Sequence, residues 1–266
     1  MFGITMAESG GTFVPPGPAS FDFSQQPLFH LGSYAVTKPV VQLFIAAIIV
    51  GGFFYAASRR ATLVPGRLQF AGESAYGMVR NSMGRDIIGS HDFRKFTPYL
   101  VALFFFILVN NVFSSIPLIQ FPTFSRASMA YALAALSWCV YNGVGIHKHG
   151  LIGYLKVQSV PSGVSPFMYP LLVPLEFFSN ILVRPVTLAL RLFANMFAGH
   201  LLLILFSTGG LFLITEVGGI GLVAGPLAWV LALAIVFLEI LVQFLQAYVF
   251  TLLNAMYISG ALADEH

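Results

Sequence analysis

Charged residues are scarce in this chain. Only 9% of its 266 residues are charged, whereas 58% are hydrophobic, and the mean hydropathy is +0.85. Ordinary soluble domains carry about 25% charged residues. The composition therefore excludes a typical soluble protein and predicts a membrane protein that crosses the bilayer several times.

Cysteine is almost absent as well. Cys139 is the single cysteine, so the chain forms no internal disulfide and has no cysteine pair for a metal site. We expect no metal and no other cofactor. The net charge of +3 is small and its basic residues are scattered, which excludes a nucleic-acid partner. The Gly-, Pro- and Ser-rich start of the chain contains no apolar signal core, so we expect no cleavable targeting peptide.

Long apolar runs are abundant, and their lengths fit membrane-spanning helices. The run at 37–58 is about long enough to cross a ~30 Å hydrocarbon core. Seven of the thirteen basic residues follow it, and the positive-inside rule predicts that this loop faces the cytoplasm or its organellar equivalent. These residues are Arg59, Arg60, Arg67, Arg80, Arg85, Arg94 and Lys95.

The runs and loops predict an all-α integral membrane protein with about three ordinary spans, an interfacial amphipathic helix, and a hairpin of two long, steeply tilted helices. The predicted segments are an irregular outer N-terminus (1–36), a first span (37–58), an inner basic loop with the amphipathic helix (59–96), the second and third spans (97–148), an inner loop (149–167), the hairpin (168–258) and a tail (259–266). In the basic loop, Leu68, Tyr76, Val79 and Met83 share one helical face. A solvated loop helix is the alternative.

The hairpin is inferred from length. Its two apolar arms, at about 168–206 and 222–258, would each extend roughly 55 Å as a helix, against a hydrocarbon thickness of ~30 Å. They must therefore be steeply tilted or broken, and the short glycine-containing loop between them favours a tilted hairpin. We expect Pro174 and Pro185 to bend the first arm without ending it.

The first arm contains a charge that needs an explanation. Arg191 stands in the apolar stretch RPVTLALRLFANMFAGH, and an arginine at the centre of a bilayer helix costs at least about 2.5 kcal/mol. Such residues usually face a protein interior or an ion path. Arg191 belongs to a polar stripe, because helical spacing places on one face Asn180, Arg184, Leu188, Arg191 and Asn195.

The second arm carries a polar stripe of its own, which includes Glu239, Gln243 and Gln246. If the arms are antiparallel, Glu176 lies toward the inner side, and His200 and Glu239 lie toward the outer side. Glu and His exchange protons near neutral pH when their surroundings tune them, whereas a guanidinium stays protonated. The pattern therefore predicts two half-pathways on either side of Arg191, which need a moving carboxylate on another subunit to connect them.

These residues resemble subunit a of F-type ATP synthases. The similarity rests on RPVTLALRLFANMFAGH, on LEILVQFLQAYVFTLLNAMY downstream, and on VPGRLQ, KHG and PSGV before them. It extends over most of the chain after about residue 30. Within the family pattern, the interval between Glu176 and Arg184 is one residue longer than expected, and Ser165 stands where proline is common.

The resemblance implies a role for each polar residue. Arg191 would face the carboxylate of a rotating c-subunit ring, with Asn195 and Gln246 beside it. His200 and Glu239 would occupy outer half-channel positions, where other members carry Glu and His respectively. Glu176 and Gln243 would complete the proton pathway.

The resemblance also implies the partners and the compartment. The partners are the c-ring, the peripheral-stalk and other membrane subunits, membrane lipids and protons, and the chain is not an enzyme on its own. The His200/Glu239 pairing resembles mitochondrial and alphaproteobacterial members, so we expect the mitochondrial inner membrane, with a bacterial plasma membrane as the alternative.

Two other functions fit the composition. A stand-alone secondary transporter could use Arg191 as an anion site, but such transporters commonly contain internal repeats, and none is visible here. A purely structural scaffold would leave the two polar stripes unexplained.

Overall fold

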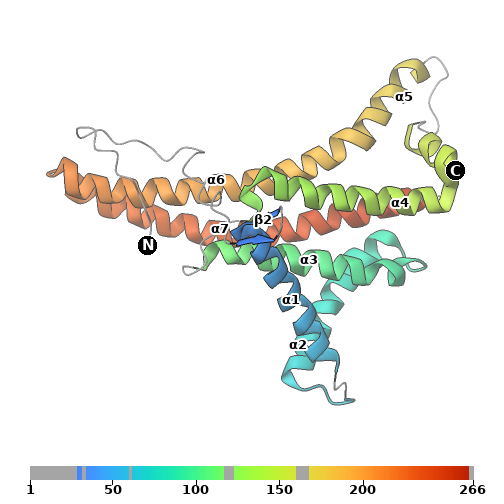
Figure 1. The fold of residues 1–266 in the computed structure, drawn as a ribbon, viewed down its shortest axis with the longest axis horizontal. Coiled ribbons are helices and arrows are strands. Elements are labelled where there is room, and N and C mark those ends of the chain that lie inside the picture. The colour runs from blue at the N-terminus through green and yellow to red at the C-terminus, as the bar shows by residue number, and fades with distance from the viewer. Residues whose placement is uncertain (1–28, 32–33, 60–61, 117–122, 160–167, 264–266) are drawn as a thin grey trace. The chain divides into compact units, whose positions relative to one another are not determined.

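A computed structural model describes residues 29–31, 34–59, 62–116, 123–159 and 168–263 (Figure 1). Among these residues, five helices are long and apolar enough to cross a membrane. They span Lys38–Ser58, Phe93–Ser115, Ala127–Lys156, Tyr169–Val217 and Gly221–Leu262. The expected all-α integral membrane architecture is confirmed.

The chain divides into two compact units. The larger contains residues 38–197 and 242–266, and the smaller contains residues 1–37 and 198–241. Helices α6 (Arg184–Phe212) and α7 (Gly221–Leu262) contribute to both units. Each unit is therefore described separately.

The core of the larger unit lies among α3 (Phe93–Ser115), α4 (Ala127–Ser159) and the parts of α6 and α7 that belong to this unit. Phe104 on α3 and Phe250 on α7 are fully buried, and Leu192 of α6 packs in the same cluster. In contrast, α1 (Lys38–Ser58) buries few side chains and exposes Phe44 and Ile48. A helix that is apolar all round suits a hydrocarbon environment.

The predicted amphipathic helix is present as α2 (Arg67–Val79), continued by the π-helix η2 (Arg80–Ile88). Val79 and Met83 are fully buried, as their spacing predicts, whereas Leu68 is exposed. Only part of the expected face therefore packs on protein. At Gly72, α2 approaches α1 so closely that an added Cβ would lie 2.6 Å from the Cβ of Ala57.

The predicted inner loop at 149–167 is partly wrong, because α4 continues to Ser159 after a break at Gly150. Gly150 adopts a φ of 71°, which glycine tolerates because it lacks a Cβ. The break lets Tyr154 fold back against Gly145, and its hydroxyl donates to Asn142 Oδ1 at 3.0 Å. Residues 160–167, with the PSGV motif and Ser165, lie outside the described residues.

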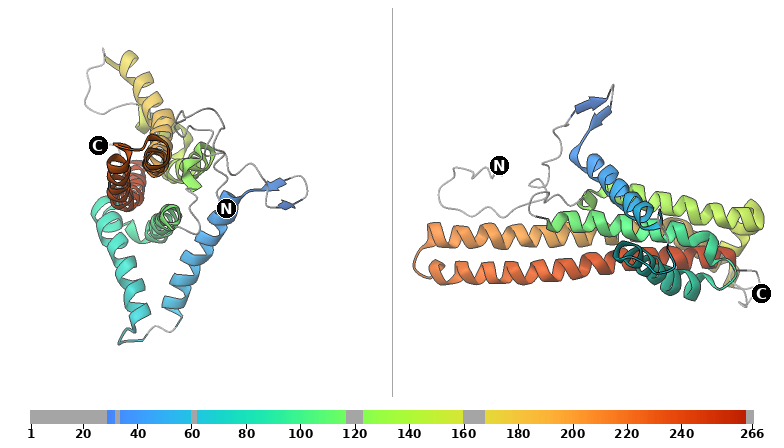
Figure 2. Two further views of the ribbon diagram at one scale, coloured as in Figure 1. Left: turned by 90° about the vertical axis from the view of Figure 1, so that its left-hand side faces the viewer. Right: turned by 90° about the horizontal axis from the view of Figure 1, so that it is seen from below.

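In the smaller unit, the end of α6 and the beginning of α7 lie side by side (Figure 2). The expected loop between the arms is shorter than predicted, because the π-helix η6 (Leu213–Val217) extends the first arm and includes Glu216. The chain then turns at Gly218 and Gly219, whose φ values are 58° and 49°. Two consecutive residues with positive φ are rarely possible without glycine.

The ends of the chain also differ from expectation. The N-terminal segment 1–36 is not wholly irregular, because β1 (Phe29–Leu31) pairs antiparallel with β2 (Tyr34–Val36), while residues 1–28 lie outside the described residues. The predicted tail at 259–266 is shorter, because α7 continues to Leu262. Lys148 of α4 donates a hydrogen bond to the carbonyl of Leu262, which satisfies a group that a helix end leaves without a helical donor.

The two glycines of α2 give a matched test of this packing. We expect Gly72→Ala to destabilise the protein by about 1–3 kcal/mol, because its methyl group overlaps Ala57. Gly77 has nothing within 4 Å of its Cβ position, so Gly77→Ala should stabilise the helix by up to about 1 kcal/mol. Thermal unfolding in detergent measures both, and equal effects of the two substitutions would contradict the close helix contact.

Candidate functional site

Arg191 is exposed on α6, at the edge of the face that packs in the core of the larger unit. Its neighbours Leu188 and Leu192 are buried, whereas Arg191 itself is exposed. Among the described residues, no carboxylate forms an ion pair with Arg191. The guanidinium is therefore available to a group from outside the chain.

Asn195 and Gln246 are brought together beside this face. Asn195 Nδ2 donates to Gln246 Oε1 at 2.7 Å and so links α6 to α7. Gln246 is 4% exposed, and its Nε2 has no hydrogen-bond partner among the described residues. A buried amide donor is costly when unsatisfied, so a water molecule that reached this group would be bound favourably.

Gln243 lies in a separate polar network with α3. Its Nε2 donates to Ser114 Oγ at 2.9 Å and to Ser115 Oγ at 2.8 Å. Asn111 Nδ2 donates to the Gln243 carbonyl at 3.1 Å. The Asn111 bond reaches the backbone carbonyl of Gln243, whereas the two serine bonds satisfy its side chain. Gln243 is 3% exposed, and apolar packing alone could not accommodate its amide group.

Glu176 belongs to a third group, where α5 (Tyr169–Phe178) meets the end of α4. Asn180 is buried and donates to Glu176 Oε2 at 3.1 Å and to the Gln158 carbonyl at 2.7 Å. Gln158 Nε2 in turn donates to the hydroxyl of Tyr154. Asn180 thus fixes the half-buried Glu176 carboxylate to the helix that the sequence had predicted as a loop.

The second arginine of the stripe, Arg184, contacts an aromatic pair instead of an acid. Its guanidinium lies 5.1 Å from the ring centroid of Tyr257, a cation–π distance. The ring of Tyr257 packs on that of Tyr141 at 5.3 Å. Arg184 is therefore held by the end of α7, unlike Arg191.

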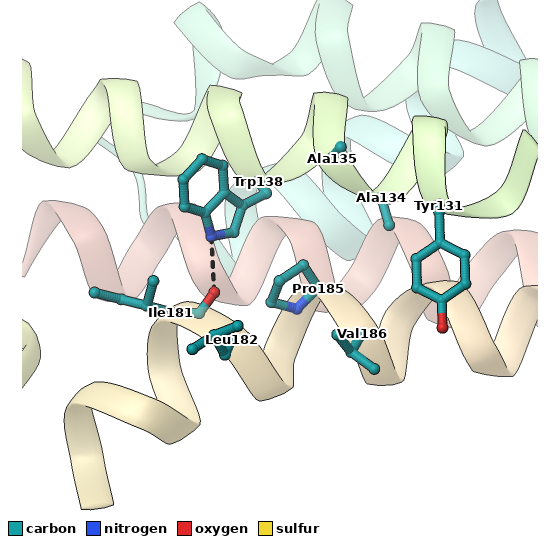
Figure 3. A pocket seen from close by; sticks show the side chains of 8 residues that line it. All are labelled: Tyr131, Ala134, Ala135, Trp138, Ile181, Leu182, Pro185 and Val186. Atoms are coloured by element: carbon teal, nitrogen blue, oxygen red, sulfur yellow. Dashed lines mark hydrogen bonds between the residues drawn. The ribbon is translucent and has the colours of Figure 1, made fainter. Parts of the chain in front are cut away.

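Between Glu176 and Arg184 the helix widens into a π-helix, η5 (Ser179–Val183), as Arg184 N–H bonds to the Ser179 carbonyl. Pro185 has no N–H, so it cannot donate to the carbonyl of Ile181 one turn earlier. The indole Nε1–H of Trp138 on α4 donates to that carbonyl at 2.9 Å (Figure 3). The expected bend at Pro185 is therefore stabilised by a side chain from another helix.

An apolar pocket surrounds this hydrogen bond between α4 and the η5–α6 segment (Figure 3). It is lined by Tyr131, Ala134, Ala135, Trp138, Ile181, Leu182, Pro185 and Val186. The pocket keeps the Trp138 to Ile181 bond among apolar side chains, where a broken hydrogen bond is costly.

His200 and Glu239 belong to the smaller unit, where α6 and α7 pack closely. Glu239 is 8% exposed, and His200 is half-buried. A Cβ on Gly199 would lie 3.4 Å from Cγ of Glu239, so the residue next to His200 contacts the Glu239 side chain. A Cβ at this distance would make an ordinary van der Waals contact, so α6 and α7 approach each other here without requiring glycine.

Sequence spacing located these groups but missed some of their members. The structure pairs Asn195 with Gln246 and places Glu239 against Gly199, whereas Gln243 turns toward α3. Ser114, Ser115 and Trp138 were not predicted. The serines follow Asn111 at helical spacing, and that signal could have identified them. No sequence signal identifies Trp138, because its partner is a backbone carbonyl.

Within the described ranges, no group of three or more His, Cys, Asp or Glu residues could hold a metal ion.

Fold and site together define a multi-pass helical membrane protein with polar side chains gathered between its helices. The family described as ATP synthase A chain matches residues 40–259. The chain belongs to this family.

Similar proteins include bacterial chains named ATP synthase subunit a. One from Nocardioides is 60% identical over 99% of this chain and 98% of its own length. One from Pseudarthrobacter chlorophenolicus is 45% identical over 98% and 97%, and one from Streptomyces lividans is 38% identical over 97% and 90%. Because these relatives are named as a subunit, the expectation that the chain is a component and not an enzyme by itself is confirmed.

The comparisons correct the expected compartment. The relatives are bacterial, so a mitochondrial inner membrane is not supported. The His200/Glu239 pairing therefore does not distinguish mitochondrial from other members. A single histidine–glutamate exchange between two contacting helices is too small a change to identify a compartment.

The Asn195–Gln246 hydrogen bond is tested by a double-mutant cycle. Asn195→Leu and Gln246→Leu each break the bond, and the pair of substitutions removes both polar groups. We expect a coupling energy of about 0.6–2 kcal/mol, the range of hydrogen bonds between membrane helices. Unfolding in mixed micelles measures it. Additive effects would show that the two amides do not interact, and Asn254→Leu, on the same helix as Gln246, serves as a control for polar-to-apolar substitution.

Proposed function

We propose that this chain is the proton-translocating subunit a of a rotary ATP synthase in a bacterial plasma membrane. The observation that carries the proposal is Arg191, which is exposed on a membrane helix and has no carboxylate partner among the described residues. Its partner would be the carboxylate of a neighbouring ring of c subunits. The family membership and the bacterial relatives support this assignment.

Arg191 acts electrostatically in this proposal. At ~4 Å and an effective dielectric of 20, a guanidinium attracts a carboxylate by about 4 kcal/mol. That attraction favours the ionised carboxylate, which then releases its proton, yet thermal rotation can still break it. Because arginine remains protonated, it also blocks protons from passing directly between the two pathways.

The remaining polar residues form the two half-pathways. Glu176, which Asn180 holds in place, belongs to the inner one, and His200 and Glu239 belong to the outer one. Asn195 and Gln246 lie beside the ring carboxylate, and the hydrogen bond to the buried Gln246 holds the exposed Asn195 in place. Gln243 supports the pathway from the α3 side through Ser114 and Ser115. The peripheral stalk and other membrane subunits hold this chain still while the ring turns.

The first test is Arg191→Ala in the assembled complex, in sealed membrane vesicles. We expect loss of ATP synthesis, while passive proton flux is preserved or increased, because the barrier between the half-pathways is removed. Arg184→Gln is the matched control. It changes another arginine of the same helix, which is held by Tyr257, and should retain coupled synthesis. Normal synthesis by Arg191→Ala would overturn the proposal and favour a stand-alone transporter.

The outer pathway is tested by exchanging its two titratable residues. Replacing either one alone, as His200→Ala or Glu239→Ala, should lower ATP-driven proton pumping by roughly 100-fold, the low end for a positioned proton-transfer group. The exchange His200→Glu with Glu239→His retains one group of each kind and should recover most of the rate. An exchange variant no better than the single variants would count against a shared pathway.

A further inference from the structure

We propose that Trp138 is a positioning residue that sets the rotational phase of Glu176 relative to Arg191, by stabilising the π-helix η5. The phase is the direction in which Glu176 points around the helix axis. The inference rests on the proposed function, because this direction would bring Glu176 to the inner proton pathway. It concerns a residue of α4 that donates its indole N–H to a backbone carbonyl and not to either charged group.

The first step is the backbone. Pro185 leaves the Ile181 carbonyl without its helical donor, and in a regular α-helix the proline ring would also press on that carbonyl. The π-helix widens the turn, and the bond from Arg184 N–H to the Ser179 carbonyl closes it. The Trp138 indole then supplies the missing donor to Ile181 at 2.9 Å, among apolar pocket residues where water cannot substitute.

The second step is the phase. A π-turn accommodates about one residue more than an α-turn, so it acts as a one-residue insertion that leaves the two flanking helices in register. With η5 in place, the Glu176 carboxylate accepts a hydrogen bond from Asn180. If the segment relaxed to an α-helix, everything before it would rotate by about one residue, or roughly 100°. Phe177 would then occupy the position of Glu176.

The third step is the connection to α4. Asn180, within η5, bonds to both the Glu176 carboxylate and the Gln158 carbonyl. Trp138 lies before the Gly150 break in α4 and Gln158 lies after it, so each of the two segments of α4 holds η5 at one point. The inner pathway is therefore aligned by a neighbouring helix and not by its own helix alone.

The test measures phase directly, by cysteine labelling in the intact complex. In a Cys139→Ser background, Glu176→Cys or Phe177→Cys introduces a single cysteine. The rate at which this cysteine reacts with a charged, water-soluble maleimide is measured in vesicles. With Trp138 present, position 176 should react about tenfold faster than position 177. Trp138→Phe keeps an aromatic ring in the pocket but removes the donor, and it should reverse or abolish this preference.

A deletion supplies the rescue. Removing Leu182, whose side chain is 47% exposed, takes one residue out of η5 and allows a regular α-helix with the original phase. Trp138→Phe combined with this deletion should restore faster labelling at position 176. A general loss of packing would not be repaired by shortening the chain.

Trp229→Phe is the matched control, because Trp229 also donates its indole N–H to a backbone carbonyl, that of Ser207, at 3.2 Å. It should leave the labelling ratio unchanged. An unchanged ratio in Trp138→Phe would overturn the positioning role, whatever happens to proton pumping. A reversed ratio with a wild-type pumping rate in Trp138→Phe would instead retain the positioning role and reject Glu176 as part of the proton pathway.

Discussion

The absence of water in the hydrocarbon is the constraint on which the rest of this structure depends. Every polar group in a membrane-spanning helix must be paired within its own chain or with a group from another subunit. Most polar side chains described here follow the first course. Gln243 is satisfied by two serines of α3, and Trp138 satisfies the carbonyl that Pro185 leaves open. Arg191 follows the second course, since no carboxylate of the described chain pairs with it.

The two arginines of α6 show how position determines what a charge can do. Arg184 lies against the ring of Tyr257, which keeps its guanidinium close to the end of α7. Arg191 lies two turns further along the same helix, and it is exposed although Leu188 and Leu192 beside it are buried. Identical side chains thus have different availability, and only one of them is free to attract a group from outside.

Much of the architecture could be predicted from the sequence, because hydrocarbon imposes length and apolarity on every span. The polar stripes of the two arms also predicted that polar side chains of α6 and α7 meet, as Asn195 and Gln246 do. The break at Gly150 and the two π-helices of the first arm could not be predicted in this way. The π-helix η5 receives a hydrogen bond from Trp138 of another helix, and the break at Gly150 accompanies the packing of the Tyr154 ring on Gly145, nine residues earlier in the same helix. No local pattern contains either contact. The expected compartment was wrong because it relied on a single residue exchange, whereas whole-chain similarity reflects many positions.

The exposed guanidinium of Arg191 also has a consequence for biogenesis. A newly inserted copy of this chain carries an unneutralised cation within a membrane-spanning helix, at a cost of at least about 2.5 kcal/mol. That cost persists until an anionic group covers the charge, so the solitary chain is less stable than the chain with its partner. Newly made copies would therefore be short-lived unless synthesis is timed to a waiting partner, and their lifetime in the membrane would report how much of that partner is present.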